Sequence, residues 1–235
     1  MKKTLLFIFL IFIIILGFAI VASQNSLKQD ITTTTTKATV TTKVHITNRN
    51  VKEEIYNYAL DINYPQTGLK EIDENILFQV FTYVNNFKQA VRVPSPSSAK
   101  KTLNISYSTI YNDDNLLSFK FVNDQYMGEK DSSHIIWTKN FVISLQEEIA
   151  FKDMLTNFDV LKLLSQYAIE EYKDQNPDEE LVLSGFEPKR ENFLSFALAD
   201  TSIIVYFDKS KTLAEDFEIN VAFDKLVADL KANNK

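Results

Sequence analysis

The sequence predicts an α+β domain in which a mainly antiparallel β-sheet packs with about three to four helices, preceded by one N-terminal apolar helix. Three observations support this fold class. Short stretches of alternating apolar and polar residues recur from residue 44 onward, turn-forming residues separate several of them, and a few longer stretches show helical spacing instead. Hairpins interleaved with a few helices are typical of α+β domains.

The first clear alternation lies in a strand that ends at Pro65. Its apolar face consists of Tyr56, Tyr58, Leu60, Ile62 and Tyr64. We interpret this aromatic ladder as core packing, and stacking on sugar rings is the alternative. Alternating residues over 39–47 also allow an earlier first strand.

A helix is predicted from Glu71 to about Val91, because apolar residues recur there at helical spacing. Acidic residues lie in its first turn, where the helix dipole favours them, and Pro94 stops it. The apolar stripe consists of Ile72, Ile76, Val80, Val84, Phe87 and Val91.

The remaining elements follow from the same two periods. Alternation predicts strands at 103–107, 117–121, 135–143, 193–198, 202–207 and 217–221. Helical spacing predicts helices over 151–172 and 223–230. Polar turns are expected at 113–115 and 199–201, and a polar loop at 128–133.

Three parts are expected along the chain: a signal anchor or signal peptide over 1–23, a threonine-rich linker over 24–43, and a folded domain over 44–235. A subdivision of the domain near 112–115 is an option. The linker contains an unbroken threonine run from Thr32 to Thr36. Such a tract buries too little apolar surface to offset the entropy lost on ordering, so we expect it to act as a spacer.

The N-terminal segment fixes the expected compartment. Residues 5–22 carry no charge and follow Lys2 and Lys3. A helix of this length reaches about 27 Å, slightly short of a hydrocarbon core of about 30 Å, whereas the apolar part of a signal peptide is usually about 7–15 residues. We therefore favour a single-pass membrane anchor with the C-terminal domain outside the cytoplasm. Secretion after cleavage near Ser23 is the alternative.

Composition argues for a folded, acidic domain. The hydrophobic fraction is 45% with 12% aromatic residues, which argues against a disordered chain. Without Lys2 and Lys3, the 25 basic residues fall to 23 against 31 acidic ones, which leaves a net charge of −8. This charge disfavours nucleic acid and favours cationic partners. No cysteine is present, so disulfides are excluded.

Most catalytic chemistry is excluded by residue supply. Three glycines follow the apolar segment, too few for a phosphate-binding loop. Because the chain contains no cysteine, a thiol nucleophile is excluded as well. The two histidines cannot form the histidine-rich metal centre of polysaccharide deacetylases. We therefore predict no enzyme and no catalytic, cofactor-binding or metal-binding residue, and the binding surface is left open.

Two features remain as candidates for chemistry. His134 follows Asp131-Ser132-Ser133 and is interpreted as a loop residue that caps a strand or bonds a turn; a general base or metal ligand is the alternative. Paired carboxylates could serve a glycoside hydrolase, although such pairs arise by chance in an acidic chain. These pairs are Glu147-Glu148, Glu170-Glu171 and Asp178-Glu179-Glu180.

Several stretches in order resemble one known pattern. They are 62–66 with the helix from Glu71, 126–134, 140–141, 152–155, and the closing segments 193–208 and 217–226. Together they resemble the extracytoplasmic domain of the RsiV-like family, a domain of unknown function found in a lysozyme-binding anti-sigma factor and in proteins associated with polysaccharide deacetylases. The family's Tyr-x-Gly-Gly-x-His loop is altered here between Gly128 and His134.

The resemblance implies a non-enzymatic cell-envelope domain that binds a protein or a glycan. A cationic protein such as lysozyme is one expected partner, and cell-wall glycan is the other. An accessory domain for peptidoglycan or polysaccharide modification is the alternative function, followed by a carboxylate-dependent glycoside hydrolase. Because only Met1–Lys3 precede the apolar segment, we expect no sigma-factor binding.

Overall fold

The computed structural model describes residues 43–92, 99–128, 132–150, 157–177, 185–209, 213 and 215–233. The predicted N-terminal helix and almost all of the linker lie outside these residues. Residues 41–235 form one structural unit. Within the described part, none of the helices combines the length and the apolar character needed to cross a membrane.

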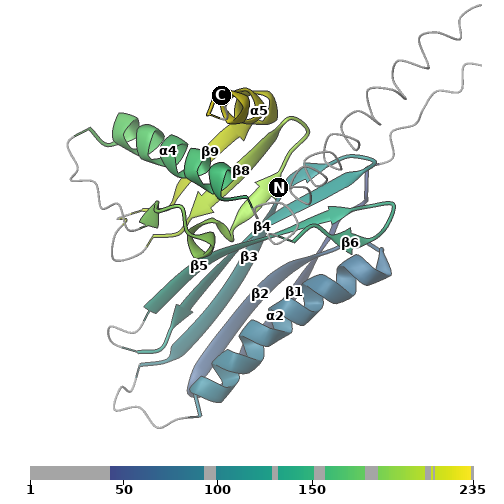
Figure 1. The fold of residues 1–235 in the computed structure, drawn as a ribbon. Helices are drawn as coiled ribbons and strands as arrows, with labels where there is room; N and C mark the ends of the chain where they lie inside the picture. Colours follow the sequence, from purple (N-terminus) through teal and green to yellow (C-terminus); the bar gives the residue numbers. More distant parts are fainter. Residues whose placement is uncertain are drawn as a thin grey trace, which may run out of the picture. The chain divides into compact units, whose positions relative to one another are not determined.

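A six-stranded sheet forms the larger part of the unit, with its strands in sequence order (Figure 1). The strands are β1 (Thr47–Glu54), β2 (Tyr58–Gln66), β3 (Lys101–Asn112), β4 (Leu116–Tyr126), β5 (Ser132–Val142) and β6 (Glu147–Glu148). All neighbours pair antiparallel except β2 and β3, which are parallel because helix α2 (Lys70–Ala90) connects them.

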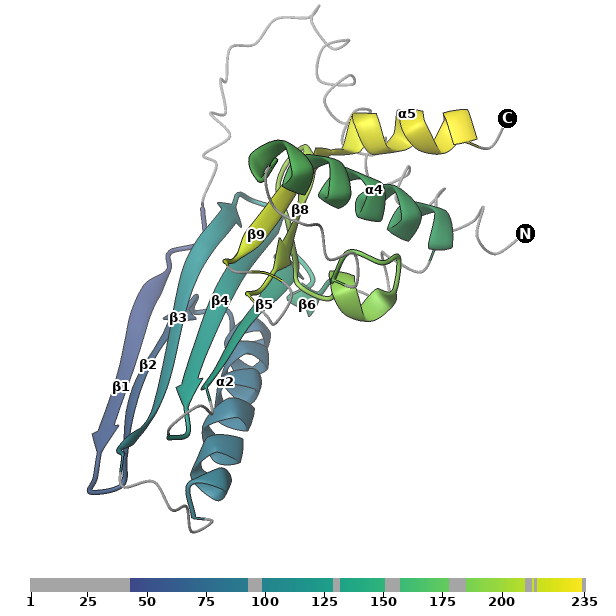
Figure 2. The ribbon, with the colours of Figure 1, turned by 90° about the vertical axis from the view of Figure 1, so that its left-hand side faces the viewer.

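Helix α2 covers one face of this sheet, which we call the inner face (Figure 2). Its buried side chains are those of the predicted stripe, Ile72, Ile76, Val80 and Phe87. They pack on alternate residues of the strands, including Leu60, Ile62, Leu103, Ile105, Phe119 and Phe121. The opposite residues of each strand point to the other face, which we call the outer face.

A three-stranded sheet forms the second layer of strands: β7 (Phe196–Leu198), β8 (Ser202–Phe207) and β9 (Phe217–Ala222), all antiparallel. Helices α4 (Phe158–Gln175) and α5 (Phe223–Asn233) pack on it, and a 3-10 turn η2 (Arg190–Phe193) precedes β7. A second hydrophobic cluster lies here, with fully buried Leu164, Ala168, Phe186, Phe193 and Val205.

Strand β7 fastens this second layer to the outer face of β5. The side chain of Asn140, 1% exposed, donates to the Phe196 carbonyl and accepts the Leu198 N–H, each at 2.8 Å. Thr138 accepts the Phe196 N–H at 3.0 Å. A small cluster of Ile136, Ala197 and Tyr206 fills the contact. The second layer therefore covers part of the outer face and leaves the rest exposed.

The predicted fold class is confirmed in its coarse form: the described residues form an α+β unit with a mainly antiparallel sheet and three α-helices. The helix predicted over 151–172 is α4, although residues 151–156 lie outside the described part. Residues 113–115, near the optional subdivision, form the turn between β3 and β4 within one sheet.

Three local predictions need correction. In the predicted strand over 39–47, the described residues 43–46 have no regular structure and β1 begins at Thr47. The predicted strand over 193–198 begins as η2, so β7 starts only at Phe196. Tyr56 is fully exposed in the turn before β2, whereas Tyr58 is buried against Phe87. The rest of the ladder therefore packs in the core.

Candidate functional site: a polar groove on the outer face

One row of polar side chains crosses five strands in register on the outer face. Cross-strand pairing joins successive members of the row, which are Lys52, Asp61, Asn104, Asp124 and His134. On β3 and β4 these residues alternate with core residues such as Leu103 and Phe121, so the pleat directs them to the outer face.

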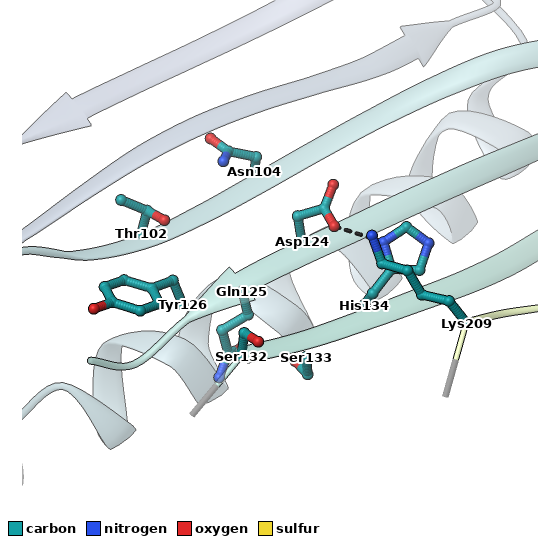
Figure 3. A pocket seen from close by; sticks show the side chains of 9 residues that line it. All are labelled: Thr102, Asn104, Asp124, Gln125, Tyr126, Ser132, Ser133, His134 and Lys209. Carbon is teal, nitrogen blue, oxygen red and sulfur yellow. Dashed lines mark hydrogen bonds and ion pairs between the residues drawn. The ribbon is translucent and has the colours of Figure 1, made fainter. Parts of the chain in front are cut away.

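A groove of about 590 Å³ opens over the β3–β5 part of this row (Figure 3). Thr102 and Asn104 come from β3, and Lys209 follows β8. The hairpin of β4 and β5 supplies the remaining lining: Asp124, Gln125, Tyr126, Ser132, Ser133 and His134. Hydroxyl, amide, carboxylate, ammonium and aromatic groups therefore surround one open space.

His134 lies deeper than its two carboxylate partners: 11% of its side chain is accessible, against 53% for Asp124 and 36% for Asp216. Its Nδ1 lies 2.6 Å from Asp124 Oδ1 on the neighbouring strand (Figure 3). Its Nε2 lies 2.9 and 3.0 Å from the two carboxylate oxygens of Asp216, which precedes β9. Both ring nitrogens therefore face carboxylates, one from each layer of strands.

Asp216 also holds the chain beside the groove. Its Oδ1 accepts the backbone N–H of Lys209 at 2.9 Å. Asp208, next to Lys209, is half-buried, and burial raises the pKa of its carboxyl above the ordinary value. A hydrogen bond from the Ile136 backbone and the charge of His134 act against this rise, and the charge of Asp216 adds to it.

Residues at the ends of β3, β4 and β5 support the strands that carry the groove. Asp113 Oδ1 accepts the backbone N–H groups of Asn115 and Leu116 at 2.8 and 2.7 Å, which fixes the β3–β4 turn. The connection between β4 and β5 contains Gly128, whose φ of 106° is outside the range that other residues adopt readily. The antiparallel pairing of β4 with β5 places Asp124 opposite His134.

The structure places His134 in strand β5 and not in the loop that the sequence predicts. It neither caps a strand nor bonds a turn, because it binds two carboxylates. Sequence reasoning missed both partners and the other groove residues. Their strand positions alternate with apolar residues and so carry a signal, but Asp216 lies 82 residues from His134 and has none.

The two predicted carboxylate pairs that the structure describes do not line this groove. Glu148 is held by Lys139 at 2.8 Å and by Asn75 at 3.0 Å, between β5 and α2. Glu170 and Glu171 are exposed on α4, and residues 178–180 lie outside the described part. Among the residues that the structure describes, no group of three histidine, aspartate or glutamate side chains is arranged to hold a metal ion.

Comparison with known proteins places the fold in a recognised class. A DUF3298 family protein from Pseudomonas aeruginosa PAO1 matches with a TM-score of 0.58 and 9% identity, over 78% of this chain and 93% of that one. A DUF3298 family member from Bacteroides fragilis NCTC 9343 matches with a TM-score of 0.52 and 12% identity, over 78% and 92%. The fold is therefore that of these domains of unknown function.

One curated protein shows detectable sequence similarity. The chain is 26% identical over 165 residues to the peptidoglycan-N-acetylmuramic acid deacetylase PdaC of Bacillus subtilis strain 168. The match spans 68% of this chain and only 35% of that protein. No family model matches the chain.

Proposed function

We propose that this chain is a non-enzymatic accessory domain of the bacterial cell envelope that binds a glycan in the outer-face groove. The carrying observation is the double engagement of His134 by Asp124 and Asp216. Both ring nitrogens are held by carboxylates, so neither is left over to bind a substrate or a metal ion. This arrangement supports a binding role.

The groove lining matches the chemistry of a glycan. Sugar hydroxyl groups both donate and accept hydrogen bonds, and Asn104, Asp124 and Thr102 supply amide, carboxylate and hydroxyl partners. The half-buried ring of Tyr126 offers an apolar face with a polar tip. The polar row crosses five strands, about 19 Å at the usual strand spacing, which is longer than one sugar ring.

The relation to PdaC supports a wall glycan as the ligand class. The name of that protein states action on peptidoglycan, and the present chain corresponds to about a third of its length. We propose association with wall modification and not the deacetylase reaction itself. Because the chain has two histidines, with His134 already held between carboxylates, it offers no histidine-rich metal centre.

Residues 5–22 are proposed to anchor the domain in the membrane and to hold it outside the cytoplasm. Release after cleavage near Ser23 is the alternative. Either arrangement would bring the groove to the wall. No nucleic acid or sigma factor is proposed as a partner.

A second candidate ligand is a cationic protein such as lysozyme, because the RsiV-like family that the sequence resembles includes a lysozyme-binding member. The net charge of −8 after Lys3 favours it. Titration with lysozyme at low and at moderate salt tests this candidate. Absence of binding at micromolar concentration would remove it.

Retention of the purified full chain on peptidoglycan, with detergent present throughout, tests the main proposal. Asn104→Ala and Tyr126→Ala are expected to weaken retention by about tenfold each, since a central polar or tyrosine contact contributes about 1–2 kcal/mol. Asn85→Ala on the exposed side of α2 and Tyr56→Ala in the exposed turn are the matched controls and should bind normally. Equal retention of all four variants would overturn the groove assignment.

A further inference from the structure

Strand β1 forms an open edge of the six-stranded sheet (Figure 2). All eight of its residues pair with β2 in one unbroken register, and in the described part of the chain no strand pairs with its other side. Proteins block strand addition with proline, with bulges or with very short edge strands, and β1 has none of these. Its single lysine, Lys52, is held by Asp61 of β2 at 3.0 Å. The edge is therefore open to another strand.

The backbone groups on the free side of β1 belong to alternate residues. Ile55 donates its N–H to the Tyr58 carbonyl at 2.9 Å, so these two form a hydrogen-bonded pair at the end of the β1–β2 ladder. In an antiparallel ladder such pairs alternate with pairs that exchange no hydrogen bonds. Odd-numbered residues of β1 therefore direct their N–H and carbonyl groups to β2, and even-numbered residues direct theirs outward. The outward groups belong to Asn48, Asn50, Lys52 and Glu54.

We propose that β1 pairs antiparallel with β1 of a second copy of this chain, about a twofold axis perpendicular to the sheet. The pairing itself does not depend on what the groove binds. In an antiparallel pair, residues directly opposite each other point to the same face. Val51 and Glu53 lie beside the core residues Ile62 and Leu60, so the odd-numbered residues of β1 belong to the inner face. Odd-numbered residues of one copy must therefore lie opposite odd-numbered residues of the other.

Charge complementarity selects one register of this pairing. When Val51 lies opposite its own copy, Arg49 of each chain lies opposite Glu53 of the other, so two ion pairs form across the interface. Moving the axis to Lys52 opposes two lysines, and moving it to Asn50 places Arg49 opposite Val51. Axes nearer the strand ends shorten the paired length. A second copy with Val51 on the axis therefore matches the charges of this edge.

The same register matches the backbone and uses accessible side chains. Even-numbered residues lie opposite one another, so outward N–H groups meet outward carbonyls. Val51, which is 44% exposed, packs on its own copy. Glu53 also binds Lys88 and keeps 36% of its side chain accessible. Arg49 donates from Nε to Gln66 at 2.5 Å, and its guanidinium carries further N–H groups for the carboxylate of the other copy.

Pairing through β1 joins the two sheets into one continuous sheet. Because the axis is perpendicular to the sheet, both outer faces lie on the same side, and each carries its groove over β3–β5. The two β4 strands are then about 34 Å apart at the usual strand spacing. Two grooves that open in one direction increase avidity for a polymeric ligand, and this consequence alone rests on the proposed function.

Cysteine cross-linking of the full chain in detergent tests the register. The chain contains no cysteine, so a single introduced thiol forms a disulfide only with another copy. Val51→Cys places two thiols in a pair whose Cα atoms lie about 4.5 Å apart, within the range that a disulfide spans. Ile55→Cys is the matched control, because it is 46% exposed but its two copies lie about 27 Å apart in this register.

Under a mild oxidant, Val51→Cys should form the disulfide dimer at least about tenfold faster than Ile55→Cys. Association through the apolar N-terminal segment alone would not favour one position over the other. Equal rates at the two positions, or no cross-linking at either, would overturn the proposal. Pairing of the edge with linker residues 24–42 or with a wall peptide would give the second of these results.

Two further variants in the Val51→Cys background separate the backbone from the side chains. Asn50→Pro removes an outward N–H and leaves the β2 ladder intact, as an edge strand tolerates. It should slow cross-linking by about tenfold, as expected when strand addition loses a backbone donor. Asn50→Ala loses the same side-chain bonds to Asp61 and Asn63 but keeps the N–H, so it should cross-link normally. Equal rates for these two variants would contradict pairing through the backbone, whether or not the chain binds a glycan.

Discussion

The same strands of the six-stranded sheet present buried apolar side chains on the inner face and polar side chains on much of the outer face. On β4, Phe119 and Phe121 are completely buried on the inner face, whereas Asp124 is exposed on the outer face. On β5, Trp137 stacks on Phe121 while His134 binds carboxylates on the other side. Because neighbouring residues serve different faces, stability and recognition should respond to different substitutions.

The largest loss of stability is expected from a substitution on the inner face. Phe121→Ala removes a ring that is 0% exposed and stacks on Trp137 with centroids 3.8 Å apart. We expect the free energy of unfolding to fall by about 3–5 kcal/mol, measured by urea titration. Phe78→Ala, at a position 75% exposed on α2, should change it by less than about 0.5 kcal/mol. Similar losses in both variants would contradict the burial of Phe121 on the inner face and the exposure of Phe78 on α2.

The second-largest loss of stability is expected in the part of the outer face that the second layer of strands covers. Asn140→Ala removes the partner of the Phe196 carbonyl and the Leu198 N–H in a buried contact. Leaving two buried backbone groups unsatisfied should cost about 2–4 kcal/mol in urea unfolding. Asn104→Ala, on the exposed part of the same face, should be nearly neutral. If the two variants were equally stable, the outer face would not be divided in this way.

A smaller effect is expected where α2 begins. Asp73 accepts hydrogen bonds from the backbone and hydroxyl of Thr67 and from the Gly68 N–H, at 2.7 to 3.0 Å. Asp73→Ala should cost about 1–2 kcal/mol, measured by thermal unfolding, because the chain before α2 loses these contacts. Glu74→Ala, which removes only an exposed ion pair with Lys70, should change stability by less than about 0.5 kcal/mol.

The smallest effect concerns the pH dependence of stability. Burial raises the pKa of Asp208 in the folded state, so its charged form disfavours folding. The contribution of this group is therefore present at low pH and is lost as the pH rises through its folded-state pKa. Asp208→Asn should lose less stability than the unchanged protein over this rise. A steeper loss in the variant would reverse the sign and contradict the burial of this carboxyl.

The inner face could be predicted from the sequence because periodicity is a local signal. The stripe from Ile72 to Phe87 and the alternation around Phe119 both report burial directly. Strand β1 cannot be predicted in the same way, because this exposed edge strand has no buried face and its residues show no alternation. The parallel pairing of β2 with β3 depends on the path of α2 and not on either strand.

The groove could be predicted only in part. The polar positions of β4 and β5 can be read from the sequence because they alternate with apolar positions, and the sequence around His134 marks it as a candidate for chemistry. Its partners depend on strand register and on the contact between the two layers, which brings Asp216 across 82 residues. Such long-range contacts leave no periodic signal in one sequence.

The proposed glycan site lies on the exposed outer face of the sheet and not on the side that α2 covers. Chemical-shift mapping of the isotopically labelled full chain, titrated with soluble peptidoglycan fragments in detergent, tests it most directly. We predict the largest shifts at Asn104, Asp124, Tyr126 and His134, with α2 unaffected. Shifts confined to α2 around Phe78 and Phe81, or no shifts at millimolar ligand, would contradict the account.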